Sequence, residues 1–314
     1  MSDLLTIGRI SVDLYGQESG HGLADAQTFQ KSVGGSPTNV AIGTARYGHS
    51  TAVITGVGDD ALGTFALHEL KKFHVATDWV IRGKGKTPIV VAGIKDPDNP
   101  EFVFYREQNA PDTQIVVDDA LRQAAASAKI FWFTGSTLSQ DPLASTVNEL
   151  LKHRKTIAGE REIIFDLDYR PAFWPDQETA HRTINGALKY ATLVIGNLDE
   201  CAVATGLARG LSARDYAAAL HAAGVQRAIV KGGPNGVLVS HDNSVTEVAG
   251  IRVKTVCGLG AGDAFGAAVV HGILSRWSLE ESVRFANAAG AYVASQLMCS
   301  DAMPTEMQVR ALLS

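Results

Sequence analysis

The chain has 314 residues and a formal net charge of −5, with 28 Lys and Arg against 33 Asp and Glu. It contains no cluster of Lys and Arg, which argues against nucleic acid or an anionic membrane as the main partner. Its three cysteines show no paired spacing, as is typical of a reducing compartment. Because the sequence shows neither a leader-like start nor an apolar run of about 20 residues, we expect a cytoplasmic location.

Apolar, β-rich runs alternate with amphipathic runs through most of the sequence. The runs that predict buried strands are residues 4–10, 51–57, 130–133, 162–167, 192–195 and 227–231. The runs that predict helices are residues 37–47, 61–73, 142–156, 179–189, 213–223, 264–275 and 279–296. This alternation predicts an α/β fold with a mostly parallel central sheet, helices on both faces, and ligands at the carboxyl ends of the strands.

Two segments, residues 11–33 and 84–107, break the alternation. The second reads as a hairpin, with runs at residues 87–94 and 101–106 around a turn rich in Asp and Pro. We expect the two segments to form a small β lid over the strand ends, where it excludes water during a reaction. The sequence shows no repeat or linker, so residues 1–314 are predicted to be a single domain. An exposed lid can pair with a second copy, which leaves a homodimer open.

Residues 258–263, with the sequence Gly-Leu-Gly-Ala-Gly-Asp, form the most informative stretch. Gly258, Gly260 and Gly262 lack Cβ atoms, so backbone N–H groups can crowd around an anion, helped by the dipole of the following helix. Asp263 is expected in the first helical turn, close enough to accept a proton from an attacking hydroxyl. The pattern suits phosphoryl transfer to an alcohol with Asp263 as the base, whereas a helix cap is the plainer interpretation.

A second glycine turn, residues 33–39, leads into a helix that Ser36 and Pro37 can start. Gly34 and Gly35 would let backbone N–H groups approach a polyhydroxylated ligand, and Asn39 offers it a donor and an acceptor. The start of a helix alone would also explain Ser36 and Pro37. Asp13 follows the first strand, where a carboxylate can accept hydrogen bonds from two sugar hydroxyls, although its position is ordinary by itself.

Two arginines stand after apolar runs. Arg106 follows the run at residues 102–105, and Arg170 follows the strand at residues 162–167. Either guanidinium can hold a substrate carboxylate through two parallel hydrogen bonds. A structural or surface ion pair is the alternative for each.

Two further motifs fit a nucleotide or a simpler role. In residues 197–200, Asn197 and Glu200 stand at a helix start, where Glu200 can hold Mg²⁺ through water or serve as part of a helix cap. Residues 231–236 read as a strand, a tight turn and another strand, and the turn glycines Gly232 and Gly233 either admit a nucleotide or make a hairpin.

Two apparent nucleotide motifs are weak. Residues 85–87 resemble the end of a P-loop, but Val80 replaces the leading glycine and a β run follows. Residues 56–61 fit a loose dinucleotide fingerprint, yet Asp59 and Asp60 would face a pyrophosphate. The rival hypothesis among enzymes is an NAD-linked dehydrogenase that uses the loop of residues 56–61.

The ordered set of motifs resembles the ribokinase-like, or PfkB, carbohydrate kinases over essentially the whole length. The strings that carry the resemblance are residues 34–39, 104–107, 109–111, 165–171, 197–200, 260–263 and 301–305. The resemblance implies a three-layer ribokinase-like fold and an ATP-dependent kinase that uses Mg²⁺ and a small-molecule sugar substrate. The sequence of these strings is most similar to that of the branch that phosphorylates the C6 hydroxyl of 5-dehydro-2-deoxygluconate in inositol catabolism. The branch acting on 2-keto-3-deoxygluconate is the alternative.

The resemblance also implies roles for individual residues. It makes Asp263 the base and gives the anion hole to the N–H groups of Gly260, Ala261 and Gly262. Sugar binding is implied for Asp13, Gly34, Gly35 and Asn39, with Arg106 and Arg170 meeting the acidic group. Contacts to the phosphates, nucleotide and Mg²⁺ are implied for Asn197, Glu200, Lys231, Gly232, Gly233, Gly258 and Asn287.

One departure from the family pattern concerns a monovalent cation. Many relatives have Asp-Thr-Thr before Gly-Ala-Gly-Asp, whereas this chain has Cys257, Gly258 and Leu259. The carboxylate usually associated with the cation is missing, so potassium activation is in doubt. A non-catalytic sugar-acid sensor is the alternative outside enzymes, and the full glycine loop with Asp263 argues against it because binding needs no base.

Overall fold

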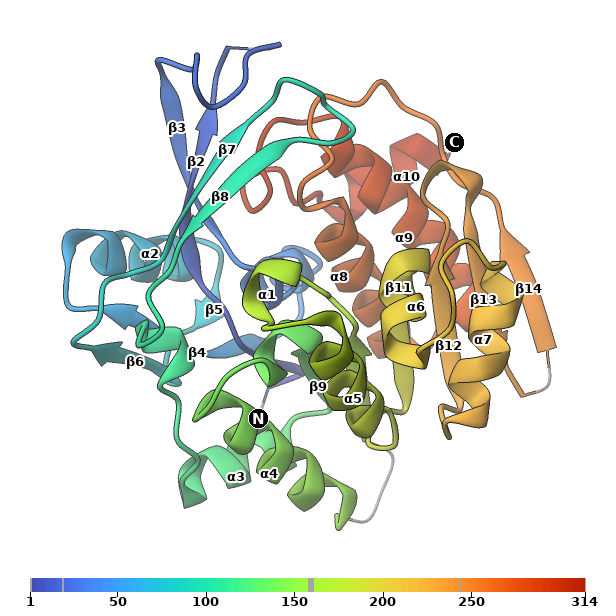
Figure 1. The fold of residues 1–314 in the computed structure, drawn as a ribbon. Helices are drawn as coiled ribbons and strands as arrows, with labels where there is room; N and C mark the ends of the chain where they lie inside the picture. Colours follow the sequence, from blue (N-terminus) through green and yellow to red (C-terminus); the bar gives the residue numbers. More distant parts are fainter. Residues whose placement is uncertain (1, 19, 158–160, 243, 314) are drawn as a thin grey trace.

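A central, mostly parallel sheet carries the fold of the computed structural model, which describes residues 2–18, 20–157, 161–242 and 244–313 (Figure 1). Its strands are β1 (Leu4–Ile7), β4 (Thr51–Gly58), β5 (Val75–Ala76), β6 (Val80–Gly83), β9 (Ile130–Thr134), β10 (Glu162–Asp166), β11 (Leu193–Asn197), β12 (Arg227–Lys231), β13 (Val237–His241) and β14 (Ser244–Val248). Their order is β14-β13-β12-β11-β10-β9-β1-β4-β5, with β6 beside β4. Among these described strands, only the pairs β12–β13 and β13–β14 are antiparallel.

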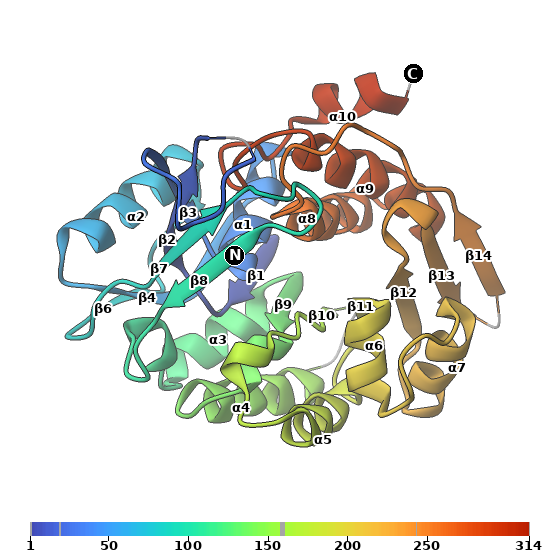
Figure 2. The same cartoon turned by 45° about the horizontal axis from the view of Figure 1, so that its top comes forward.

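Helices cover both faces of this sheet (Figures 1 and 2). They are α1 (Ser36–Arg46), α2 (Ala61–Lys72), α3 (Asp119–Ser127), α4 (Leu143–Lys155), α5 (Gln177–Leu188), α6 (Leu198–Thr205), α7 (Ala213–Ala222), α8 (Ala261–Leu274), α9 (Leu279–Ala294) and α10 (Glu306–Leu313). Successive strand residues point to opposite faces. Leu4 therefore packs in the core beneath α1, α8 and α9, and Leu5 packs in the core beneath α3 to α7. This is the predicted three-layer arrangement.

A second sheet, which we name the lid sheet, stands over one edge of the central sheet (Figure 1). It pairs β3 (Phe29–Gly34), β2 (Ser11–Gly16), β7 (Ile89–Gly93) and β8 (Glu101–Tyr105) in that order. The strands come from the two segments that break the helix-strand alternation, so the predicted pairing of these segments is confirmed. β1 ends at Ile7 rather than at residue 10, because the chain leaves the central sheet there and continues as β2.

The sheet edge beneath the lid gathers the elements that carry the candidate site. The parallel strands β1, β10, β11 and β12 all end on this edge, which is the usual ligand side of such a sheet. Helix α8 starts at Ala261, three residues before the predicted start, so Asp263 lies within its first turn. The helices α3, α6 and α10 are short, 8 or 9 residues each, and were not predicted.

Two expectations from composition concern the pairing of the cysteines and the presence of a membrane-spanning helix. Cys201, Cys257 and Cys299 are all free and buried, in agreement with the absence of paired spacing. In the part of the chain that the structure describes, none of the helices combines the length and apolar character needed to cross a membrane.

Candidate active site

The glycine loop before α8 has a backbone conformation that requires glycine and lies at a helix N-terminus. Gly260 precedes the helix in the left-handed region, with φ of 79°, which favours glycine. A Cβ there would also lie 2.6 Å from Sγ of Cys299, so the position tolerates no side chain. The first N–H groups of α8 have no partners within the helix and point out of its N-terminus. They provide the dipole end and the donors that an anion needs.

Asp263 is held in the first turn of α8 by a contact from α1. Nδ2 of Asn39 donates a hydrogen bond of 2.7 Å to Oδ2 of Asp263. Burial raises the pKa of the Asp263 carboxyl, whereas the Asn39 bond acts in the opposite direction by favouring the charged form. The carboxylate is thus oriented and made more basic, which are the properties of a general base.

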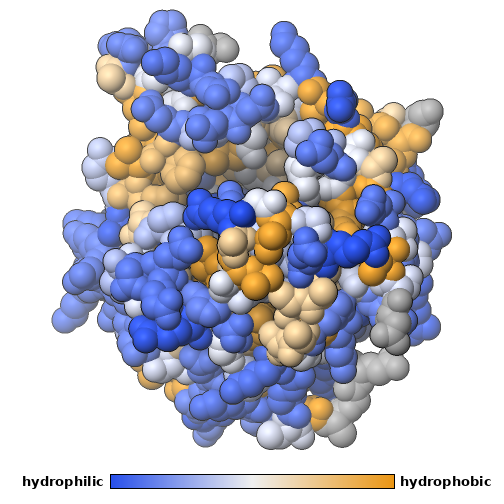
Figure 3. Space-filling model, turned by 45° about the vertical axis from the view of Figure 1, so that its right-hand side comes forward, coloured by the Kyte–Doolittle hydropathy of each residue, from blue (hydrophilic) through white to orange (hydrophobic). Residues whose placement is uncertain are grey.

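A cavity of about 110 Å³ opens beside this carboxylate, between the lid sheet and the starts of α1 and α8. Its walls bring together residues that are far apart in the sequence: Arg9, Asp13, Gly35, Asn39, Phe102, Phe104, Arg170, Gly260 and Asp263. Figure 3 shows, from one side, apolar surface in a recess beneath the polar residues of the lid. Asp13, Gly35, Asn39 and Arg170, which the sequence analysis singled out, therefore share one cavity with Asp263.

Asp13 and the glycine turn lie against each other in this cavity. Oδ1 of Asp13 accepts a hydrogen bond of 2.6 Å from Oγ of Ser11, and burial raises the pKa of this carboxyl. A Cβ on Gly34 would lie only 2.0 Å from Asp13, which explains the glycine there by space alone. Gly35 has φ of 104° and would bring a Cβ within 2.3 Å of the Arg9 carbonyl oxygen.

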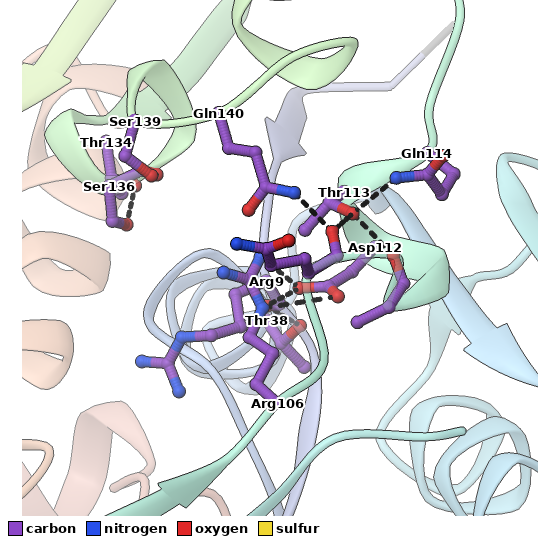
Figure 4. A network of polar contacts seen from close by, with 12 residues as sticks. Arg9, Thr38, Arg106, Asp112, Thr113, Gln114, Thr134, Ser136, Ser139 and Gln140 are labelled. Carbon is purple, nitrogen blue, oxygen red and sulfur yellow. Dashed lines mark hydrogen bonds and ion pairs between the residues drawn. The ribbon is translucent and has the colours of Figure 1, made fainter. Parts of the chain in front are cut away.

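The two predicted arginines have different surroundings. Arg106 donates to Asp112 through Nε at 3.1 Å and Nη2 at 2.7 Å (Figure 4), and it is not among the residues that line the cavity. Arg170 does line the cavity, with Nη2 2.9 Å from Oδ1 of Asp168. The proximity of Asp168 raises the pKa of Arg170, so its charge is secure. Both arginines thus form ion pairs, which was the alternative interpretation for each. Arg170 also lines the cavity beside Asp263.

Of the predicted nucleotide residues, Lys231 lies beside the α8 loop and Gly232 lines a second hollow, whereas the Gly258 N–H donates to the carbonyl oxygen of Pro97 in the lid hairpin. A Cβ on Gly262 would lie 3.5 Å from Nζ of Lys231. The Lys231 ammonium, at the end of β12, therefore faces the glycine loop of residues 258–262, which we name the anion loop. Gly232 lines a hollow of about 490 Å³ together with Leu198 and Ala249. Nδ2 of Asn287 donates to the carbonyl oxygen of Ala249 over 2.8 Å, which ties α9 to the same hollow.

Asn197 and Glu200 form a reciprocal cap at the start of α6. Oδ1 of Asn197 accepts from the Glu200 N–H, and Oε2 of Glu200 accepts from the Asn197 N–H, both over 2.8 Å. The capping interpretation is therefore correct for their local structure. This cap uses Oε2 of Glu200, so the other carboxylate oxygen takes no part in it. Glu200 lies at the same sheet edge as Lys231 and the α8 loop.

Asp166 at the end of β10 was missed by the sequence reasoning. Burial, and then the negative charges of Glu200, Asp168 and Asp263, raise the pKa of this carboxyl to about 8, while Lys231 acts in the opposite direction. Such an accumulation of negative charge is what a divalent cation with its phosphates would relieve. No group of three His, Cys, Asp or Glu side chains within the described ranges is placed to hold a metal ion directly.

Arg9 was also missed, although it stands two residues after the end of β1 and lines the same cavity as Asp13, which lies in β2. The sequence analysis placed Arg9 inside a strand over residues 4–10, so the rule that selected Asp13, a polar residue just after that strand, did not select Arg9. A larger hollow of about 650 Å³, lined by His221, Arg227 and Ser240, contains neither the anion loop nor the base. We therefore place the candidate site at the smaller cavity.

A profile of the family described as pfkB family carbohydrate kinase matches residues 1–306. The chain belongs to the PfkB family of carbohydrate kinases. It is accordingly a sugar kinase, a phosphotransferase with an alcohol acceptor. The chain is 30% identical to a 5-dehydro-2-deoxygluconokinase from Geobacillus kaustophilus, over 98% of this chain and 92% of that protein. It is 28% identical to the Listeria monocytogenes protein of that name, over 99% and 96%.

Solved structures give the same picture of the fold. A fructokinase from Vibrio cholerae with fructose, ADP and calcium bound has a TM-score of 0.85 at 25% identity, covering 100% of this chain and 99% of the other. A sugar kinase from Pyrococcus horikoshii in complex with ATP has a TM-score of 0.80 at 26% identity, covering 98% and 99%. The ribokinase-like fold of this PfkB protein is thus confirmed.

Proposed function

We propose that this PfkB kinase transfers the γ-phosphoryl group of ATP to the C6 hydroxyl of 5-dehydro-2-deoxygluconate, in inositol catabolism. The observation that carries the proposal is the position of Asp263. It stands in the first turn of α8, bonded to Asn39, between the acceptor cavity and the anion loop. A hydroxyl in the cavity would lose its proton to Asp263 as its oxygen attacks the phosphorus atom.

Residues on the two sides of Asp263 would have two further roles, which are to stabilise the transferred phosphoryl group and to bind the sugar. The N–H groups of Gly260, Ala261 and Gly262 would receive the charge that develops on the transferred phosphoryl group. Asp13, Gly34, Gly35 and Asn39 would orient the sugar hydroxyls. Phe102 and Phe104 would exclude water.

The residues of the nucleotide side fit ATP with Mg²⁺. Lys231 faces the anion loop, and the carboxyl groups of Glu200 and Asp166 lie close by, where a bound cation would favour the charged form of Asp166. The hollow beside Gly232 and Gly233 would take the nucleoside, with Asn287 holding its wall and Asn197 starting the helix that carries Glu200. When bound, Mg²⁺ supplies positive charge to the phosphates, and we assign Glu200 to it through water. The relatives with bound ATP or ADP support a nucleotide site in this fold.

An acidic acceptor is supported by the charge of the cavity and by the names of the relatives. Arg9 and Arg170 line the cavity, whereas the charge of Arg106 is paired with that of Asp112. A chain with net charge −5 has to meet a carboxylate with local cations of this kind. The relatives named 5-dehydro-2-deoxygluconokinase point to the same class of substrate.

The lid sheet supports two further parts of the proposal. A cavity of about 110 Å³ is smaller than the roughly 300–1,000 Å³ of typical ligand sites, so the lid would move to admit a six-carbon acid. The apolar side chains of Val103 and Tyr105 are exposed on β8, on the face opposite to Phe102 and Phe104, which line the cavity. They would suit a homodimer through the lid, within a single-domain cytoplasmic enzyme that spans residues 1–314.

The test is a coupled assay of ADP release with 5-dehydro-2-deoxygluconate, 2-keto-3-deoxygluconate, fructose and ribose. We expect kcat/KM to be highest for 5-dehydro-2-deoxygluconate. A higher value for 2-keto-3-deoxygluconate would assign the enzyme to that acid, and a higher value for fructose or ribose would reject an acidic acceptor. Binding of a sugar acid without any ADP release would indicate the sensor, and hydride transfer to NAD would indicate the dehydrogenase.

A further inference from the structure

Two arginines, Arg9 and Arg170, line the acceptor cavity, and Arg106 lies outside its lining. Arg106 is paired with Asp112 and Arg170 with Asp168. Arg9 lines the cavity, and across the described ranges no carboxylate lies within ion-pair distance of its guanidinium. Its Nε is buried and has no hydrogen-bond partner. Arg9 is therefore the cation of this cavity whose bonding capacity is unused.

The carboxylate nearest to Arg9 in the chain does not compensate it. Asp13 accepts hydrogen bonds from Ser11 at 2.6 Å and from the hydroxyl of Tyr15 at 3.2 Å, so its two oxygens are already engaged. Asp13 and Asp168 favour the charged form of Arg9 only through the electrostatic field, against the effect of burial. Since an arginine in a protein does not give up its proton, the site holds a desolvated positive charge.

The surroundings of Arg9 hold it in place without using its donors. The Arg9 carbonyl oxygen accepts a hydrogen bond of 3.1 Å from Oγ1 of Thr38, at the start of α1 (Figure 4). The guanidinium carbon lies 5.1 Å from the ring centre of Phe104 and 5.8 Å from that of Phe173. Aromatic rings at such distances favour a planar cation and leave the in-plane N–H groups available. The site is thus preorganised for a planar anion.

We propose that Arg9 binds the carboxylate of the acceptor sugar acid and so sets the preference for acidic over neutral sugars. This inference rests on the proposed function, since it requires an acidic acceptor. Arg170, on the other wall of the cavity, adds charge to the same carboxylate. Arg106 instead supports the wall, because its donors are taken by Asp112. Arg9 is a specificity residue in this scheme, and Asp263 keeps its role as base.

The test compares binding of the keto-deoxy sugar acid with binding of its neutral primary amide, by calorimetry without nucleotide, in wild type, Arg9→Met and Arg9→Lys. Arg9→Met should weaken binding of the acid by about 10- to 150-fold and binding of the amide by less than about 3-fold. Arg9→Lys should fall between, because it keeps the charge but loses the planar fork. Arg82→Met is the matched control, since Arg82 pairs with the exposed Asp59 away from the cavity.

Each outcome decides one of the two claims. If wild type phosphorylates the acid and both Arg9 variants keep its full preference for acid over amide, the role of Arg9 is wrong and the proposed function stands. If wild type phosphorylates only neutral sugars, the proposed function fails, and the role of Arg9 with it. If Arg9→Met does not fold, Arg9→Lys decides, because an unchanged ratio of the two binding constants in that variant overturns the proposal.

Discussion

Asn39 joins α1 to the candidate base, with its Nδ2 2.7 Å from Oδ2 of Asp263. Its other amide atom, Oδ1, accepts a hydrogen bond of 2.7 Å from Oγ of Ser300. These two bonds fix which end of the amide faces the carboxylate. A residue that the sequence analysis assigned to the sugar therefore also orients the base, across 224 positions of sequence.

Removing the base should separate catalysis from binding. We expect Asp263→Asn to lower kcat by at least about 100-fold, the usual scale for a lost general base, with folding and nucleotide binding nearly unchanged. Single-turnover kinetics, thermal unfolding and ATP titration measure the three quantities. Turnover within a few-fold of wild type would remove Asp263 from the mechanism.

Removing the bond to the base should change the pH dependence of catalysis. The Asn39 N–H stabilises the charged carboxylate, so its loss in Asn39→Ala raises the pKa of Asp263 further above its ordinary value. A higher pH is then needed to ionise the base, and the acid limb of the kcat profile moves upward. At high pH, kcat should still be roughly 5- to 10-fold lower, for one lost hydrogen bond.

The control for this variant is Asn148→Ala, because the side-chain hydrogen bond that Asn148 makes within the described residues stays inside α4, to the carbonyl oxygen of Ala144. Its pH profile should superimpose on that of wild type. An acid limb at the same pH in Asn39→Ala and in wild type would show that the titrating group is not Asp263.

The local parts of the fold were predictable, whereas the long-range contacts were not. The run at residues 227–231 became β12, because a short continuous apolar run, here Ala-Ile-Val, is typical of a buried strand whatever its neighbours are. The bond between Asn39 and Asp263 depends on how α1 and α8 pack, which no local pattern encodes. The pairing of Arg106 with Asp112 is close in sequence, but it lies at a short turn without periodicity, so its geometry could not be derived.

Arg106 should matter more for stability than for substrate binding. The Asp112 side chain is 0% exposed, so Arg106→Met leaves a buried carboxylate without its partner. Loss of one partner from a buried pair usually lowers the free energy of unfolding by about 3–5 kcal/mol. Urea unfolding should show this loss, and the double variant Arg106→Met with Asp112→Asn should recover part of it. Unchanged stability with weaker binding of acidic sugars alone would restore the contact predicted from sequence.

Potassium should have little effect on this kinase. Cys257 is buried where many relatives carry an Asp, and a thiol is a poor ligand for a hard monovalent cation. Replacing K⁺ by a bulky organic cation at constant Mg²⁺ and ionic strength should change kcat/KM by less than about 3-fold, a barrier change under about 0.7 kcal/mol. A tenfold rise on adding K⁺ would mean that backbone carbonyls near residues 256–258 form the ion site without a carboxylate.

A histidine pair, formed by the buried His271 of α8 and the partly buried His49, should make stability depend on pH. Nδ1 of His271 lies 2.8 Å from Nε2 of His49, and the rings of Tyr47, Trp277 and Phe285 surround His271. Burial, and then the neighbouring His49, lower the pKa of His271 to about 4. The folded state therefore holds this imidazole neutral, whereas the unfolded chain binds a proton near pH 6.5.

Because the unfolded state binds more protons between about pH 6.5 and pH 4, the contribution of His271 is fully present above pH 6.5 and is lost as the pH falls toward 4. The loss should be on the order of 1–3 kcal/mol, since nearby solvent screens part of the effect. Urea unfolding at pH 7.5 and pH 5 should show a smaller acid-induced loss in His271→Gln than in wild type. The exposed His68→Gln should behave like wild type, and parallel losses in all three proteins would exclude His271 as the cause.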